Sequence, residues 1–334
     1  MRQVHLPAYN KNILRAIYSL QTVEKPIPVP QENEVLIQVH GAPCNPSDIA
    51  FMEGGYNVVK PLPAVPGFEG SGHIVEAGEG AEHLIGSKVS FFVQAEGDGS
   101  WSEFVCTKAD HIVVLDDAMD LDQAACFALN PFTARGLLDI ALLKNEQAII
   151  QNAAGGQVAA FVRQMATEMG FRVIDIVRKE ESRKKLLQQG AEYVLLESDE
   201  DFEAQLTDLS HQLKARVAFD AVGGKLSGQI FNAMPDNAEL VLYGGLSTKA
   251  ISGISTMDLI FNDKIISGFN LPDWRNHLDD DYFLEISNQM QQQFIKGKYQ
   301  TLIQGATDYE NIVKGLIHYI RKMSDGKILI KPNL

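Results

Sequence analysis

Short runs of alternating apolar and polar residues dominate the first 120 positions of the chain. Residues 35–40, 73–77, 88–93 and 104–107 each have the composition of a strand. The segments between them, such as GAPCNPSD and KPLPAVPGFEG, are rich in the Gly, Pro and Asn that are typical of turns. Many short strands separated by such turns predict a barrel-like, β-rich unit.

The pattern changes near position 120. Apolar residues at helical spacing predict helices over 121–129 and 133–141, with Pro131 breaking the chain between them. Short apolar runs then predict strands at 148–151, 171–177, 193–196, 217–220, 239–243 and 265–269, and the intervening segments predict helices at 158–169, 180–189, 202–214 and 225–233. Strands that alternate with helices of this length predict βαβ units, and hence a doubly wound parallel sheet over residues 121–270.

The last part of the chain predicts helices at 282–296 and 309–323 and a strand at 327–331. We expect this segment to return to the first unit. The predicted organisation is therefore an α/β protein in three parts: residues 1–120 of the β-rich unit, 121–270 of the doubly wound unit, and 271–334 of the β-rich unit again.

The segment AIIQNAAGGQVAAF predicts a strand, a tight turn and a helix. Small residues at Ala153, Gly156 and Ala159 stand where a dinucleotide-binding turn needs close backbone approach and close packing of helix on sheet. The N-terminus of the following helix would offer unpaired N–H groups and a positive dipole end to a pyrophosphate. Because two of the usual glycines are alanines, a crowded strand-to-helix turn is the alternative interpretation.

The next predicted strand ends at Val177 and is followed by Arg178 and Lys179. An acidic residue here would favour NADH, whereas an arginine pairs bidentately with the 2′-phosphate of NADPH. Asp175 lies earlier, inside the strand, and is not expected to reach the ribose. We therefore predict NADPH, with NADH as the alternative because Glu180 lies close by and the basic residues could simply begin a solvated helix.

Net charge and cysteine content exclude several classes of binding partner and of fold. The formal net charge is −14, which argues against nucleic acid or an anionic membrane surface as a general partner. The three cysteines are too few and too scattered for a disulfide framework, and no apolar run reaches the length of a membrane span. The first 20 residues lack the apolar stretch of a secretory signal, so we expect a cytoplasmic protein.

Several further motifs give the chain a family resemblance over almost its whole length. They are 45–48 (NPSD), 53–56 (EGGY), 63–72 (PAVPGFEGSG), 99–104 (GSWSEF), 130–134 (NPFTA), 151–159 (QNAAGGQVA), 176–178 (IVR), 243–246 (YGGL) and 260–274 (IFNDKIISGFNLPDW). Together they resemble the medium-chain dehydrogenase/reductase superfamily, in its zinc-free quinone oxidoreductase and 2-enoyl thioester reductase branch. The resemblance implies a Rossmann domain, a GroES-like β-rich catalytic domain and a homodimer joined through the Rossmann domains.

The resemblance also implies a set of site residues. Tyr56 matches the tyrosine that enoyl thioester reductases use as proton donor, although it could be an exposed turn residue, and quinone reductases carry a tyrosine here too. The cofactor-binding residues are expected to be Asn45, Asn130, Thr133, Gly155, Gly156, Gln157, Val158, Arg178, Lys179, Tyr243, Gly244, Gly245, Leu246, Phe269, Asn270 and Leu271.

Zinc-dependent members of the superfamily place a Cys just before the Ser-Asp stretch and a His in a Gly-His-Glu motif. Asn45 and Phe68 occupy those positions here, and neither supplies the thiolate or imidazole that catalytic zinc prefers. We therefore predict no metal.

The expected activity is zinc-independent, NADPH-dependent hydride transfer to a small electrophile, either an enoyl thioester or enone, or a quinone. The turn Gly155-Gly156-Gln157 is more typical of quinone reductases, whereas 260–274 is more typical of enoyl thioester reductases. The alternatives are a non-catalytic NADPH-binding structural or regulatory protein of the same fold and, least favoured, a zinc alcohol dehydrogenase.

Overall fold

The computed structural model describes residues 1–56, 58–93 and 97–334. It divides into a β-rich unit, Met1–Asn130 with Asp280–Leu334, and an α/β unit, Pro131–Asp279. The fold class is the predicted one, a parallel Rossmann sheet together with a β-rich GroES-like domain. None of the helices in the described part of the chain combines the length and apolar character needed to cross a membrane.

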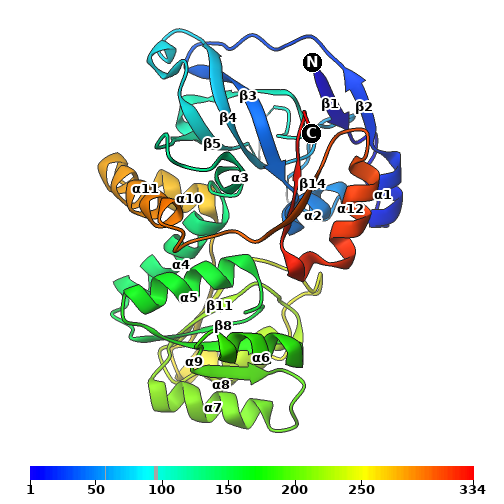
Figure 1. Ribbon diagram of the computed structural model, residues 1–334. Helices are drawn as coiled ribbons and strands as arrows, with labels where there is room; N and C mark the ends of the chain where they lie inside the picture. Colours follow the sequence, from blue (N-terminus) through cyan, green and yellow to red (C-terminus); the bar gives the residue numbers. More distant parts are fainter. Residues whose placement is uncertain (57, 94–96) are drawn as a thin grey trace. The chain divides into compact units, whose positions relative to one another are not determined.

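The β-rich unit is built on a seven-stranded sheet, drawn mostly in blue and cyan in Figure 1. Its strands run in the order β14-β15-β3-β4-β5-β7, with β6 also paired to β3. The elements are β1 (Arg2–His5), α1 (Ile13–Ser19), β2 (Gln21–Glu24), β3 (Glu34–Pro43), α2 (Pro46–Glu53), β4 (Glu69–Ala77), β5 (Lys88–Phe92), β6 (Phe104–Lys108), β7 (Ile112–Val114), α3 (Leu121–Ala124), α11 (Asp280–Ile295), β14 (Ile303–Thr307), α12 (Ile312–Arg321) and β15 (Lys327–Ile330), with short 3₁₀ turns at Glu82–Leu84, Ala109–His111 and Met323–Asp325.

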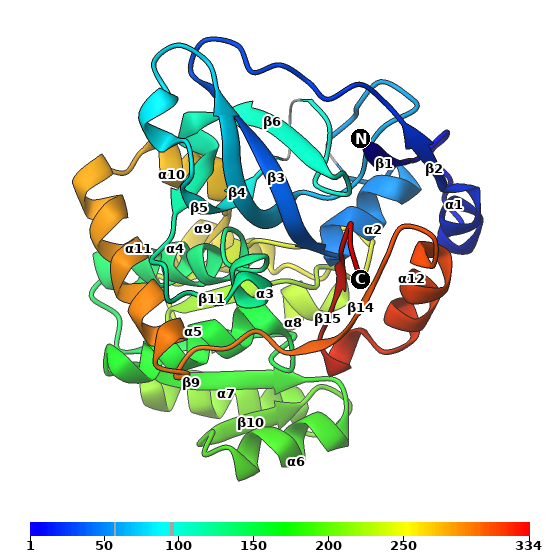
Figure 2. The same ribbon diagram turned by 45° about the horizontal axis from the view of Figure 1, so that its top comes forward.

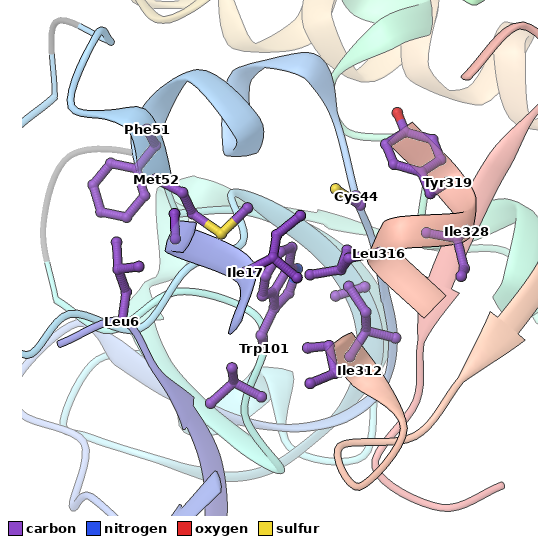
Figure 3. Packing of buried hydrophobic residues seen from close by; sticks show 14 of the residues in the cluster. Leu6, Ile17, Cys44, Phe51, Met52, Trp101, Ile312, Leu316, Tyr319 and Ile328 are labelled. Atoms are coloured by element: carbon purple, nitrogen blue, oxygen red, sulfur yellow. The ribbon is translucent and has the colours of Figure 1, made fainter. Parts of the chain in front are cut away.

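The end of the chain belongs to the sheet of this unit. Strand β15 pairs antiparallel with β3, in the register Leu329 opposite Pro43. Helices α1, α2 and α12 bury their apolar residues in one core with Trp101, which is fully buried (Figure 3). Residues from both ends of the sequence therefore fold as one unit.

The α/β unit holds a six-stranded parallel sheet in the order β10-β9-β8-β11-β12-β13. Figure 2 labels β9, β10 and β11 of this sheet. Its elements are β8 (Ala148–Gln151), α5 (Gln157–Glu168), β9 (Arg172–Val177), α6 (Glu180–Gln188), β10 (Tyr193–Leu196), α7 (Phe202–Leu213), β11 (Val217–Asp220), α8 (Lys225–Ala233), β12 (Glu239–Leu242), α9 (Thr256–Phe261), β13 (Ile265–Gly268) and α10 (Leu271–Asn276). The chain moves outward from β8 to β10 and then continues on the other side with β11. The carboxyl ends of β8 and β11 therefore flank the switch point at which ligands bind in sheets of this kind.

Two predictions around residue 130 were wrong. The helix expected over 121–129 is only α3, which ends at Ala124 and is followed by turns. Helix α4 (Asn130–Leu143) begins before Pro131 rather than after it. A proline is tolerated in the first turn of a helix because the N–H that it lacks would have no partner within the helix.

Candidate functional site

The turn between β8 and α5 has the geometry of a phosphate-binding loop. Ala153 adopts a left-handed backbone conformation with φ 47°, and the Gly156 N–H donates to the Ala153 carbonyl at 2.8 Å. Gly155 and Gly156 are exposed, while Gln157 and Val158 are half-buried at the start of α5. Gly156 caps the helix without a side-chain hydrogen bond, so the first turn of α5 can offer N–H groups to an anion.

Hydrogen bonds among buried and half-buried polar side chains hold this turn in place. The Arg163 guanidinium donates to the Ala154 carbonyl at 3.2 Å and to the Asp175 carboxylate at 2.8 Å. The Gln151 amide donates to the same carboxylate at 2.7 Å. Burial raises the pKa of Asp175, and Arg163 and Gln151 oppose that shift. The carboxylate of Asp175 thus faces the interior, and sequence reasoning did not identify Gln151 or Arg163 as its partners.

Arg178 and Lys179 lie exposed at the carboxyl end of β9. Arg178 is close enough to Glu197 to oppose the rise that burial causes in the pKa of Glu197. The Ser182 hydroxyl lies beside the turn between β8 and α5, 3.5 Å from where a Cβ on Gly155 would be. Ser182 was not among the predicted site residues. It lies in the first turn of α6, and its proximity to Gly155 in the turn after β8 is evident only from the three-dimensional structure.

Asp220 organises the carboxyl end of β11. Its buried carboxylate accepts hydrogen bonds from the Asn152 side chain at 2.6 Å, from the backbone N–H groups of Val222 and Gly223 at 2.7 and 3.0 Å, and from the Ser227 hydroxyl. The carboxylate therefore ties the turn after β8 to the loop after β11 and to the start of α8. Sequence reasoning missed this role.

The second predicted glycine motif packs against that loop. The Tyr243 N–H donates to the Asp220 carbonyl at 2.9 Å, and the Leu246 N–H donates to the Ala221 carbonyl at 3.0 Å. A Cβ on Gly244 would lie 2.9 Å from the Ala221 carbonyl oxygen, so close approach of the two segments requires glycine there. Gly245 and Leu246 are exposed at the same edge of the sheet, next to the switch point.

Five further cofactor candidates lie on α4 and after β13. Asn130 and Thr133 are buried on α4, and the Asn130 Nδ2 has no hydrogen-bond partner among the described residues. The half-buried Phe269 ring lies 6.4 Å from that of Trp274 and leaves no room for a side chain at Gly136. Asn270 caps α10 by accepting the Asp273 N–H at 3.1 Å, and Leu271 is half-buried at the first position of that helix.

Tyr56 lies in the β-rich unit, just after α2. Gly54 ends the helix in the left-handed conformation with φ 72°, which a glycine adopts without strain. The half-buried Tyr56 ring stacks on the Phe68 ring at 5.5 Å with an interplanar angle of 29°. The Phe68 ring in turn receives the edge of Phe51 and faces the Lys60 ammonium.

Asn45 caps the other end of α2 and is almost completely buried. Its Nδ2 donates to the Glu69 carboxylate at 2.8 Å, its Oδ1 accepts from the Lys327 ammonium, and its N–H donates to Asp48 at 2.7 Å. Burial raises the pKa of Glu69 and that of Asp48 to about 7, and the Lys327 charge opposes both shifts. The polar atoms of the Asn45 side chain are thus used within the unit.

The residues at the positions of the zinc ligands do not fit a metal ion. The Asn45 Oδ1 already accepts from an ammonium, and Phe68 presents an aromatic ring. Within the described ranges, no group of three or more His, Cys, Asp or Glu side chains could hold a metal ion.

Comparisons with known proteins agree with this architecture. Residues 31–117 match the alcohol dehydrogenase GroES-like domain, and residues 158–283 match the zinc-binding dehydrogenase family. The mitochondrial enoyl-[acyl-carrier-protein] reductase of Caenorhabditis elegans is 33% identical over 79% of this chain and 78% of its own length.

Solved structures give the same picture. A Mesorhizobium loti protein described as an NADPH:quinone reductase is 31% identical over 99% of this chain and 98% of its own, with a TM-score of 0.91. A mycobacterial protein solved in complex with NADPH is 20% identical, covers 99% of this chain and all of its own, and has a TM-score of 0.80, which shows the fold alone. The chain belongs to the medium-chain dehydrogenase/reductase superfamily, and it is an oxidoreductase of that superfamily with relatives among the enoyl reductases and the quinone reductases.

Proposed function

We propose that this protein is a zinc-independent, NADPH-dependent reductase of activated carbon–carbon double bonds in enoyl thioesters or enones. One observation carries the proposal: an open phosphate-binding turn at the switch point of the α/β unit is followed by Arg178 at the tip of the next strand. The similarity to an enoyl reductase over 79% of the chain supports the choice of acceptor.

The residues of the α/β unit would hold the dinucleotide. The turn 153–156 and the first turn of α5 bind the pyrophosphate, and Arg178 with Lys179 and Ser182 binds the 2′-phosphate. Bound NADPH would supply the hydride. Hydride addition to an enoyl β-carbon leaves negative charge on the thioester oxygen and α-carbon, and Tyr56 donates the proton that neutralises it.

Replacing Arg178 by Ala is expected to raise the Kd for NADPH by about 10- to 100-fold, because a charge-assisted pair with the 2′-phosphate is lost. The Kd for NADH should stay within about threefold of the wild-type value, since NADH lacks that phosphate. Both constants can be measured by titration of nucleotide fluorescence.

Lys184→Ala is the matched control, because it removes one exposed positive charge from α6, the helix that follows Arg178. It should leave both constants close to those of the wild type. Equal weakening of NADPH and NADH by Arg178→Ala would contradict the assignment of Arg178 to the 2′-phosphate.

A quinone is the second candidate acceptor. The Mesorhizobium loti relative matches nearly the whole chain, and the turn Gly155-Gly156-Gln157 is typical of quinone reductases. A quinone ring accepts reducing equivalents without requiring an acid at an α-carbon, so Tyr56 would then be a wall of the site rather than a proton donor.

We also propose that the protein acts as a homodimer joined along β13. This strand is an edge of the parallel sheet and pairs only with β12 among the described residues. Exposed apolar side chains gather on it and on the preceding helix α9: Met257, Leu259, Ile260, Phe261 and Ile265. The other edge strand, β10, buries its apolar residues. A second copy related by a two-fold axis would extend the sheet and cover these side chains.

Phe261→Asp is expected to convert the dimer to a monomer at micromolar concentration, because Phe261 is 72% exposed in the single chain and would bring an unpaired charge into the interface. Light scattering after size-exclusion chromatography gives the mass. Leu187→Asp, at a 46% exposed leucine on α6, is the control and should remain dimeric. A wild-type chain that elutes as a monomer at every concentration would exclude this interface.

The cytoplasm is our proposed location. Cys44, Cys106 and Cys126 are all free thiols, as a reducing compartment would keep them. The mitochondrial location in the name of the Caenorhabditis elegans reductase is a property of that protein.

A further inference from the structure

Lys327 places an ammonium group in the interior of the β-rich unit. It lies at the start of β15, and the residue is 6% exposed. Its Nζ donates to the Asn45 Oδ1, 282 positions earlier in the chain, and its charge acts on the buried carboxyl groups of Asp48 and Glu69. A lysine is rarely buried unless it is paired, and here Asn45 and the two buried carboxyl groups provide the partners of the ammonium group.

Asn45, which accepts from Lys327, and Glu69, which accepts from Asn45, each lie next to an element that adjoins Tyr56. Asn45 caps α2, and Tyr56 follows the C-terminal end of that eight-residue helix. Glu69, which holds the Asn45 amide at 2.8 Å, is next in sequence to Phe68, and the Phe68 ring stacks on Tyr56. The same hydrogen-bonded cluster thus anchors the start of the helix that precedes Tyr56, and it includes the residue next in sequence to the ring on which Tyr56 stacks.

The cluster lies at the positions where zinc-dependent relatives carry metal ligands. Asn45 replaces the cysteine and Phe68 replaces the histidine, and the oxygen that could face a cation accepts from Lys327 instead. The positive charge at this position of the fold comes from a side chain of the protein.

We propose that Lys327 is a positioning residue for Tyr56: through Asn45 and Glu69 it fixes the orientation from which Tyr56 donates its proton. The inference rests on the proposed function for the role of Tyr56. The position of the Tyr56 ring can nevertheless be tested without any measurement of activity.

The direct test is fluorine NMR of protein labelled with fluorotyrosine at its nine tyrosines. The Tyr56 resonance is assigned by its absence in Tyr56→Phe. Lys327→Met should shift or broaden this resonance, whereas Lys264→Met should leave it unchanged. Lys264 is the matched control because it is also buried, and its ammonium pairs with Asp258 at 3.1 Å in the α/β unit. An unmoved Tyr56 resonance in Lys327→Met overturns the inference.

A double-mutant cycle gives the corresponding kinetic readout. Lys327→Met should lower kcat for enoyl thioester reduction by about 10- to 100-fold, the range of coupling within one hydrogen-bond network, with little change in KM for NADPH. In the Tyr56→Phe background the same substitution should cost less than about threefold. Equal losses in both backgrounds would mean that Lys327 acts independently of Tyr56 and would overturn the inference.

Lys327→Met removes a cation that acts on the buried carboxyl groups of Asp48 and Glu69, and this loss could prevent folding. Lys327→Met combined with Glu69→Gln removes the cation and one carboxylate together, and the same displacement of the Tyr56 resonance is expected. If the wild-type protein reduces no activated double bond, the proposed function fails, while the NMR comparison still decides whether Lys327 positions Tyr56.

Discussion

Replacing Tyr56 by Phe is expected to lower kcat for reduction of an enoyl thioester by about 100- to 1,000-fold, the contribution typical of a positioned general acid. The phenyl ring can keep its stacking on Phe68, so the substitution removes the hydroxyl and little else. The Kd for NADPH should not change, because the residues proposed to bind the dinucleotide lie in the α/β unit. Steady-state kinetics with a saturating enoyl thioester provides the measurement.

Tyr18→Phe is the control for this substitution, since Tyr18 is a 69% exposed tyrosine on α1 of the same unit. Its kcat should equal that of the wild type. Quinone reduction by Tyr56→Phe, if the protein catalyses it, should also be preserved. A Tyr56→Phe variant that reduces the enoyl thioester at the wild-type rate would remove Tyr56 from the chemistry.

The second large effect is expected on stability. Asp220→Ala should lower the free energy of unfolding of the α/β unit by about 4 kcal/mol, because several buried donors would lose one shared acceptor. The loss of protection from exchange should be largest at the carboxyl ends of β8 and β11, close to these donors. Hydrogen–deuterium exchange of peptides from those strands reports the opening free energy directly.

Asp236→Ala provides the comparison, because Asp236 is an exposed residue in the turn between α8 and β12. This substitution should change the opening free energy measured by exchange by no more than about 0.5 kcal/mol, as is usual for surface substitutions. Unchanged protection of β8 and β11 in Asp220→Ala would show that these strands are held together by packing alone.

The strands of the α/β unit could be predicted from sequence because each is a short, largely apolar run. The predictions for β10 and β11 match the observed bounds, since parallel strands buried on both faces leave that signature. Helix α2 was not predicted, because Asn45-Pro46 was interpreted as part of a turn between strands. The same pair is also a favourable helix start, with Asn as cap and Pro in the first turn.

The candidate site was predictable where it depends on local motifs and not where it depends on distant partners. Gly155, Gly156 and Arg178 could be identified because a strand, a turn and a helix follow one another in the sequence. The contacts of Lys327 with Asn45, and of Asp220 with Asn152, join segments far apart along the chain. A single sequence contains no signal for such pairs. The inward orientation of the Asn45 side chain could therefore not be predicted, because it depends on the contacts with Glu69 and Lys327.

The most direct test of the central claim is consumption of NADPH by the purified protein with crotonyl-CoA, with phenanthrenequinone and without acceptor, each repeated with NADH. We expect turnover of the enoyl thioester with a preference for NADPH. Turnover of the quinone alone would make the protein a quinone reductase. Tight NADPH binding with no turnover of either acceptor would contradict an enzymatic role and favour a non-catalytic NADPH-binding protein of the same fold.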